Sequence, residues 1–436
     1  MRGLIASVST ALVAFVAACS SSNPTSTSAD LSDPGGTVST SDLSFAAGCD
    51  WSTALDVSNN NYAYPETHST YWLAVGPTTP APGMRLRIEG RYANARYFSL
   101  QVYNGHGAIE GGLADFQITP DVAGTNTFSS DTARSGAAPG GTFTAYVNFE
   151  AAPAVADVNT IYRSSAMANA NAVRKRTYLI LRVYLPANGA GEDGGYGLPT
   201  LVLETPGGEI PLSQTPDAAA CGQLYNRIVD HSASHINLIG KPPHNPPRFQ
   251  SFKGIANGLL GPGVLYNEDS AYVYATTSLR KGELQLVRAQ APTFTDEPSG
   301  PAGPQVRYWS ICQNDYVTQA VSACVADADA VLDSGGFFNV VISDPANRPA
   351  NATVANGFNW LPYGDTQFKG NILYRNLVTS PTFTQGTKDT PVFGDLSRTM
   401  GDYAPQATYC SRATFEASQG LSPQAVFDAC KAASSP

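Results

Sequence analysis

Four arginines lie within or at the start of apolar, strand-like runs: Arg96, Arg182, Arg307 and Arg375. A guanidinium buried in such a run needs a carboxylate or carbonyl partner, and Asp269 or Glu268 could serve Arg307 or Arg375. Because arginine presents a planar fork of donors, one interpretation is an anion- or sugar-binding site. The other is a structural ion pair, which the recurrence of these arginines in both halves of the chain favours.

Tyrosine is abundant, with 21 in the chain. Alternation along the strands predicts that Tyr97, Tyr103 and Tyr308 lie on the face opposite the core. Exposed tyrosines on a flat sheet can stack on sugar rings or contact a partner, whereas a second sheet or an interface between the two halves would bury them. The candidate ligand-binding residues are Arg307, Arg375, Asp269, Tyr308 and Tyr272.

Recognisable catalytic patterns are missing from the sequence. Ser99, His106 and Asp115 could be combined into a triad, but no Gly-x-Ser-x-Gly nucleophile elbow is present. Glu192 and Asp193 lie in a Gly-rich stretch that is typical of a turn, or at best of a weak Ca²⁺ loop, rather than of a glycosidase carboxylate pair. We therefore assign no catalytic residue and expect no cofactor.

Histidine spacing offers one weak metal pattern. His231 and His235 are four residues apart and would share a face of a helix, with His244 as a third ligand. Proline-rich sequence follows, so the polar end of a helix is the preferred interpretation. The cysteines form no Cys-x-x-Cys pair, and we expect no metal site.

The strand that carries Arg96 recurs later in the chain. The run Arg96-Tyr97-Phe98-Ser99-Leu100-Gln101-Val102-Tyr103-Asn104 is matched by Arg307-Tyr308-Trp309-Ser310-Ile311-Cys312-Gln313-Asn314. Four more blocks recur in the same order: 66–75 with 267–275, 83–89 with 282–288, 140–147 with 335–342, and 178–182 with 371–375. Five blocks in one order predict the duplication of a single unit.

Short strands separated by Gly/Pro-rich turns predict a mainly β protein with two tandem β-sandwich or jelly-roll domains and a short helical C-terminal tail. We place the first domain at 46–230, a Pro-rich linker at 231–262, the second domain at 263–400 and the tail at 401–436.

Several residues of these strands resemble a family of uncharacterised exported bacterial proteins with paired β-sandwich domains of unknown function. The second half carries the resemblance through Asn267-x-Asp269-x-x-Tyr272, Arg307-Tyr308-Trp309-Ser310-x-Cys312, Arg348-Pro349 and Trp360-Leu361-Pro362. The first half matches through Tyr71-Trp72 and Arg96-Tyr97-Phe98-Ser99, but has Glu66 and Thr67 where the second half has Glu268 and Asp269. The resemblance implies the fold and no known activity.

The N-terminus resembles a lipoprotein signal peptide. After Arg2, an apolar run from Leu4 to Val16 ends in Val16-Ala17-Ala18-Cys19, which is similar to the bacterial lipobox. We expect a signal peptide at 1–19, lipidation of Cys19 and a flexible tether at 20–45. Ser20 after the cysteine indicates the outer membrane if the source is Gram-negative, and otherwise the outer face of the plasma membrane.

Six cysteines remain after Cys19: Cys49, Cys221, Cys312, Cys324, Cys410 and Cys430. Export to an oxidising compartment favours disulfides. Fifteen connectivities are possible, and we expect nearest neighbours to pair, which joins Cys49 to Cys221, Cys312 to Cys324, and Cys410 to Cys430.

Composition limits the possible partners. The 436 residues carry a net charge of -9, and only 14% are charged, which argues against a nucleic-acid partner. We expect a lipid-anchored, non-enzymatic envelope module that binds a glycan, a small molecule or an envelope protein. The alternatives are a hydrolase of an envelope or extracellular polymer, and a purely structural envelope protein. An open pocket around the arginines would favour binding or catalysis, and burial between sheets would favour structure.

Overall fold

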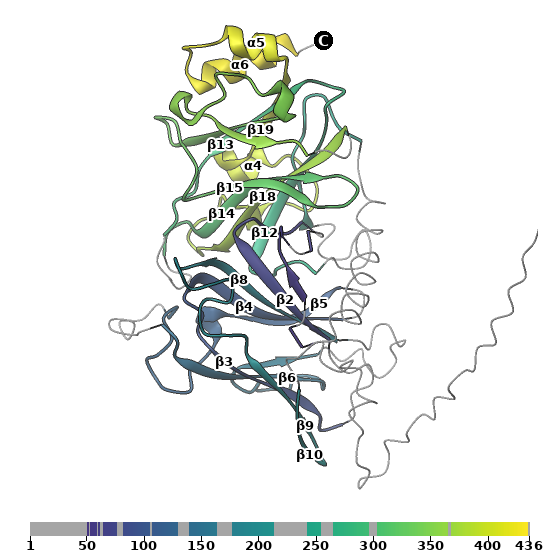
Figure 1. The fold of residues 1–436 in the computed structure, drawn as a ribbon. Helices are drawn as coiled ribbons and strands as arrows, with labels where there is room; N and C mark the ends of the chain where they lie inside the picture. The colour runs from purple at the N-terminus through teal and green to yellow at the C-terminus, as the bar shows by residue number, and fades with distance from the viewer. Residues whose placement is uncertain are drawn as a thin grey trace, which may run out of the picture.

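The computed structural model describes residues 50–434 except for 52, 59, 62–63, 76–81, 105–106, 130–138, 164–176, 213–241, 254–264, 296–302 and 365–367. Over these residues the protein is mainly β, with four sheets in two sandwiches and a few helices near the C-terminus (Figure 1). The predicted fold class is confirmed.

The first sandwich contains sheet A, in the order β1-β2-β8-β4-β5, and sheet B, in the order β10-β9-β3-β6-β7. The bounds are β1 Thr53–Leu55, β2 Ser69–Val75, β3 Arg85–Arg91, β4 Ala95–Asn104, β5 Ile109–Ala114, β6 Thr142–Asn148, β7 Thr160–Tyr162, β8 Thr177–Pro186, β9 Thr200–Thr205 and β10 Gly208–Pro211, with a short 3-10 helix η1 at Asp115–Gln117. Phe98, Leu100 and Val102 of β4 point into the core between the sheets and meet Leu86 and Ile88 of β3.

The second sandwich contains sheet C, in the order β11-β12-β18-β14-β15, and sheet D, in the order β17-β16-β13-β19. The bounds are β11 Gln250–Ser251, β12 Ser270–Ser278, β13 Leu284–Gln290, β14 Val306–Asp315, β15 Val321–Ala326, β16 Phe337–Ser343, β17 Asn359–Pro362, β18 Lys369–Thr379 and β19 Gln406–Cys410. Trp309 and Ile311 of β14 lie in its core with Val287 of β13 and Val340 of β16.

The two sandwiches share one topology. Strands β2-β8-β4-β5 of sheet A correspond to β12-β18-β14-β15 of sheet C, and β9-β3-β6-β7 corresponds to β19-β13-β16-β17. The parallel pair β6–β7 has its counterpart in β16–β17. Register agrees as well, since Tyr71 lies opposite Arg182 in sheet A and Tyr272 lies opposite Arg375 in sheet C. All five recurring sequence blocks fall on equivalent strands, as the duplication of one unit requires.

Sheet A packs face to face against sheet C, so that the protein has four sheet layers (Figure 1). The rings of Tyr184 in β8 and Tyr308 in β14 lie 5.7 Å apart, centroid to centroid. Tyr97, Tyr103 and Tyr308 are 0% exposed. The interpretation in which these tyrosines form an open sugar-stacking face is therefore wrong, because the other sandwich covers them. Burial on both faces also accounts for the nearly continuous burial of β4 and β14.

The C-terminal tail closes the far side of sheet D, where α5 (Arg412–Ala417) and α6 (Pro423–Ala433) pack (Figure 1). Ser411 and Ser422 cap these two helices through their side chains. The segment 401–436 is not wholly helical, however, because it begins with η7 (Gly401–Tyr403) and β19. Strand β19 pairs with β13 and takes the place beside β13 that β9 takes beside β3 in the first sandwich, where β10 adds a further strand.

The remaining short helices are η4 Pro345–Asn347, η5 Val354–Asn356, η6 Thr387–Asp389 and α4 Ser397–Met400. Strand β11 lies inside the segment 231–262 that was predicted as a linker, because extended chain next to prolines can still pair at a sheet edge. None of the helices in the described part of the chain has the length and apolar character of a membrane span.

Two of the three predicted disulfides are present. Cys312 in β14 is bonded to Cys324 in β15, and Cys410 in β19 is bonded to Cys430 in α6. Such bonds indicate a location outside the cytoplasm. The predicted partners Cys49 and Cys221 lie outside the described residues, as do Cys19, the signal peptide 1–19 and the tether 20–45.

Candidate functional site

Two equivalent ion pairs connect the sandwiches. Arg307 of the second sandwich binds Asp115 of the first, and Arg96 of the first binds Asp327 of the second, each with a nitrogen–oxygen distance of 2.7 Å. Both aspartates directly follow equivalent strands, β5 and β15. All four side chains are buried, and burial raises the pKa of each aspartate to about 6 although an arginine is next to it.

Each aspartate is also bound to its own sandwich. Asp115 accepts the backbone N–H of Phe98 at 2.9 Å, and Asp327 accepts that of Trp309 at 3.1 Å. The recurring Arg-Tyr-aromatic-Ser run is thereby explained: the arginine reaches the other sandwich, and the N–H of the aromatic residue orients the aspartate that the opposite arginine binds. Asp269 and Glu268 were the expected partners of Arg307. This expectation was wrong, because Arg307 binds Asp115, which is 192 positions away in the other half of the chain.

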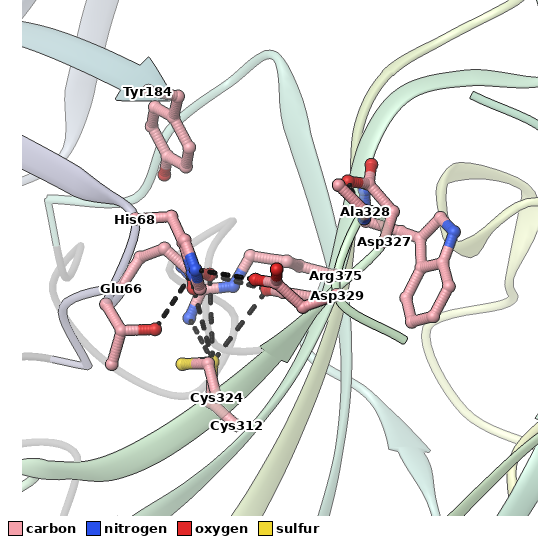
Figure 2. Close-up of polar contacts among 12 residues, drawn as sticks. Glu66, His68, Tyr184, Cys312, Cys324, Asp327, Ala328, Asp329 and Arg375 are labelled. Carbon is pink, nitrogen blue, oxygen red and sulfur yellow. Dashed lines mark hydrogen bonds and ion pairs between the residues drawn. A yellow bond between two sulfur atoms is a disulfide. The ribbon is translucent and has the colours of Figure 1, made fainter. Parts of the chain in front are cut away.

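A second buried polar group surrounds Glu66, which precedes β2. Arg375 of β18 lies 3.3 Å from Glu66 Oε2, and Ser310 of β14 donates a hydrogen bond to the same oxygen. Burial alone would raise the pKa of Glu66, but Arg375 and the hydrogen-bond donors hold it below its ordinary value. Figure 2 shows Glu66 beside Arg375 and the Cys312–Cys324 bond. For Arg375, too, the expected acidic partner was wrong, because Glu66 takes that place.

His68 extends this group toward the surface. Its Nδ1 lies 3.6 Å from Glu66 Oε1, and its Nε2 lies 3.1 Å from Asp329 Oδ2 of the second sandwich (Figure 2). The hydrogen bond to Glu66 raises the pKa of His68 above its ordinary value, and the charge of Asp329 adds to the effect. When His68 is protonated, it bridges the two sandwiches through Glu66 and Asp329.

We expect this bridge to make stability depend on pH. Because the pKa of His68 is raised in the folded state, its stabilising contribution is complete at low pH and is lost as pH rises through the folded-state pKa. Between about pH 6 and about pH 9 the wild type should lose more unfolding free energy than His68→Gln. Urea denaturation of both proteins at the two pH values measures this difference, and parallel losses would contradict the assignment.

Strand register corrects the expected alignment of the two halves. Ser69 lies opposite Tyr184, and Ser270 lies opposite Leu377 at the equivalent position. Three residues before these serines, Glu66 of the first half corresponds to Asn267 of the second. The expected alignment, in which Glu66 and Thr67 correspond to Glu268 and Asp269, was therefore wrong. The second half has an amide where the first half has a carboxylate.

The chain just before β2 and β12 crosses to the opposite sandwich in the same way. The N–H of Tyr64 donates to the carbonyl of Gln319, and the N–H of Leu265 donates to the carbonyl of Gly107, both at 3.0 Å. Tyr64 and Leu265 both have a left-handed backbone, with φ of 58° and 55°, a conformation that costs free energy in residues with a side chain. The two crossing segments place these residues over the edges of sheets A and C.

Between the crossing segments lies a cavity of about 50 Å³. Two arginines and four tyrosines contribute to its lining: Arg182, Arg375, Tyr64, Tyr71, Tyr266 and Tyr272. Both sandwiches contribute, and the two arginines are equivalent residues of β8 and β18. Each arginine faces the tyrosine opposite it in register, with Arg182 5.1 Å from the centre of the Tyr71 ring and Arg375 5.6 Å from that of Tyr272.

The five residues predicted to bind a ligand are divided between two regions of the interface. Arg375 and Tyr272 line the cavity. Asp269 lies nearby and accepts hydrogen bonds from Tyr97 and Gln101. Arg307 and Tyr308 are buried elsewhere between the sheets.

Two polar residues of the cavity lining, Arg182 and Asn267, were not among the candidate ligand-binding residues. Arg182 was noted only as an arginine in an apolar run, although it is the counterpart of Arg375. Asn267 was noted only within a family pattern. Aligning the two halves on their strands would have identified both.

The triad and the histidine pattern of the sequence each include residues outside the described part of the chain. Ser99 and Asp115 are buried, while His106, His231 and His235 lie outside the described residues and His244 is exposed. Asp193 accepts backbone N–H groups from Gly195 and Gly197, as in a turn. Among the described residues, Glu66, Cys312 and Cys324 are close enough together to hold a metal, but the disulfide leaves no thiolate there.

No protein-family model and no curated protein matches the sequence. Among solved structures, an uncharacterised protein from Burkholderia cenocepacia is 15% identical, with a TM-score of 0.44 over 74% of this chain and 76% of that one. A protein from Vibrio parahaemolyticus is 8% identical, with a TM-score of 0.39 over 79% of this chain and 92% of that one. The chain is thus structurally similar to uncharacterised bacterial proteins.

Proposed function

We propose that this protein is a ligand-binding module of the cell envelope, which holds a small molecule in the cavity between its two sandwiches. The observation that carries the proposal is that Arg182 and Arg375, equivalent residues of the two halves, line the same cavity. Buried arginines of duplicated scaffolds normally serve as structural ion pairs, as Arg96 and Arg307 do here. An arginine pair beside a cavity has donors to offer to a ligand.

The size and walls of the cavity favour a small ligand over a glycan chain or a protein. A volume of about 50 Å³ suits a group of a few heavy atoms. Tyrosine and leucine side chains form most of the wall, and the arginines supply the polar contacts that orient a ligand. The tyrosines proposed to stack on sugars are buried.

The proposal includes the membrane anchor. Leu4 to Cys19 have the pattern of a lipoprotein signal peptide, and lipidation of Cys19 with a tether at 20–45 would hold the sandwiches at a membrane surface. In a Gram-negative cell that membrane would be the outer membrane. The two disulfides agree with such an environment.

A thermal-shift screen tests the binding function. The chain from residue 20 onward keeps every described residue and should be screened with small carboxylates, amides, sugars and inorganic anions. We expect at least one compound to raise the melting temperature of the wild type, and Tyr272→Ala to abolish that shift.

Tyr162→Ala is the matched control, because Tyr162 is also partly buried but belongs to β7, on the outer sheet B. It should keep the shift. The proposal would be overturned if no compound produced a shift, or if Tyr272→Ala responded as the wild type does while both variants melted cooperatively.

A further inference from the structure

We propose that the cavity is a carboxylate-binding site centred on Arg182, in which the ligand supplies the negative charge that Glu66 supplies to Arg375. This inference rests on the proposed binding function and adds the chemical class of the ligand. It comes from comparing two equivalent arginines within one chain.

The two arginines differ in one respect. Arg375 has a carboxylate partner, because Glu66 lies 3.3 Å away. At the position equivalent to Glu66 the second half has Asn267, which is neutral and lines the same cavity as Arg182. Arg182 donates instead to two uncharged acceptors, Gln101 Oε1 at 2.8 Å and the carbonyl of Leu265 at 2.6 Å.

Arg182 is therefore a buried cation without an ion pair. It is 3% exposed, and no carboxylate of the described residues lies within ion-pair distance of it. Burial raises the pKa of Asp269 and Glu268, and the charge of Arg182 partly opposes this rise, but neither carboxylate contacts the guanidinium. Because buried charges are paired or bound in almost all proteins, a buried arginine with only uncharged acceptors beside a cavity favours an anionic ligand.

Two further donors line the same cavity without an acceptor. The Nδ2 of Asn267 and the Nε of Arg375 have no hydrogen-bond partner among the described residues. These side chains are 2% and 1% exposed. The Oδ1 of Asn267 accepts from Tyr97, Gln101 and the N–H of Asp269, which fixes the amide with Nδ2 as its free end. A guanidinium and two unsatisfied N–H groups form a set of donors, as an oxyanion requires.

The walls distinguish an organic carboxylate from an inorganic anion. Phe252, Leu265 and Leu373 join the tyrosines around the cavity, and apolar surface of this kind favours a hydrocarbon group over the hydration shell of sulfate or phosphate. A short monocarboxylate places two oxygens on the donors and its alkyl group against the rings. The volume of about 50 Å³ suits acetate or propionate.

Binding of acetate and of its neutral isostere acetamide to the chain from residue 20 onward tests the inference. Calorimetry and thermal shift at constant ionic strength should detect acetate and propionate and not acetamide. Arg182→Gln should weaken acetate binding by at least about tenfold, the loss expected for a charge-assisted contact. Asn267→Asp should do the same, because it introduces a carboxylate into the cavity lining at the position equivalent to Glu66. Arg398→Gln, which changes an exposed arginine, should bind acetate as the wild type does.

Three results would overturn the inference: equal binding of acetamide and acetate, binding of sulfate without acetate, or unchanged acetate affinity in Arg182→Gln. Suppose instead that the wild type binds a neutral compound but no carboxylate, and that Tyr272→Ala abolishes this binding. This result would overturn the carboxylate assignment and would support the proposed binding function. No response to any compound would overturn both.

Discussion

Arg375→Gln should lower the free energy of unfolding by about 3–5 kcal/mol, because it leaves the buried carboxylate of Glu66 without its arginine partner, with only His68 and Ser310 beside it. Glu66 is 0% exposed and has Arg375 as its arginine partner. Glutamine retains a donor but not the charge, so burial would again raise the pKa of Glu66. Urea denaturation near neutral pH, followed by tryptophan fluorescence, measures the loss.

The equivalent change on the other side of the cavity is the control. Arg182→Gln removes a cation that has no carboxylate partner, and it should cost only about 1 kcal/mol, because removal of a buried unpaired charge offsets most of the loss of the hydrogen bonds to Gln101 and Leu265. Equal losses in the two variants would contradict the difference in charge pairing between the two halves.

Arg307→Met should produce a second loss of about 3–5 kcal/mol by leaving Asp115 without its ion-pair partner. Arg96→Met removes the equivalent ion pair, with Asp327, and should cost a similar amount. Replacing both members of one pair, as in Arg307→Met with Asp115→Leu, should recover part of the loss, because no buried charge then remains unpaired. Denaturation of the single and double variants gives the coupling energy.

A loss below about 1 kcal/mol for Arg307→Met, the range of exposed ion pairs, would show that the pair is not buried in solution. Unfolding in two separate transitions in Arg307→Met, but not in the wild type, would instead identify the ion pairs as the contacts that couple the sandwiches.

The architecture of each sandwich could be read from the sequence, because it depends on local patterns. Alternation placed Phe98, Leu100 and Val102 in the core, and recurrence of the Arg96 strand at Arg307 revealed the duplication. These signals lie within about ten neighbouring residues and follow from the two-residue period of a strand.

The packing of one sandwich on the other could not be predicted in the same way. Alternation shows that Tyr97 and Tyr308 point away from their own cores, but it does not show what covers them. The aspartates that bind Arg307 and Arg96 are 192 and 231 positions away in sequence, and nothing near either arginine identifies them. For this reason Asp269 and Glu268 were the candidate partners of Arg307, whereas Asp115 binds it.

The candidate site was only partly recognised from the sequence. Its main feature is a difference in charge between the two halves, in which, among the described residues, one arginine has a carboxylate beside it and the equivalent arginine does not. Arg375 and Tyr272 were identified from their residue types. Arg182 acquires its significance only when strand register shows that Asn267 stands where Glu66 stands in the other half. An asparagine such as Asn267 gives no signal in the sequence by itself. It indicates a site only when the structure shows that Arg182 has no carboxylate of the described residues beside it.

A crystal structure of the chain from residue 20 onward, grown with propionate, tests the central claim most directly. The account predicts a carboxylate in the cavity between sheets A and C, with its oxygens about 3 Å from the guanidinium of Arg182 and from Asn267 Nδ2. Ordered water in the cavity, with propionate elsewhere or not bound at all, would contradict it.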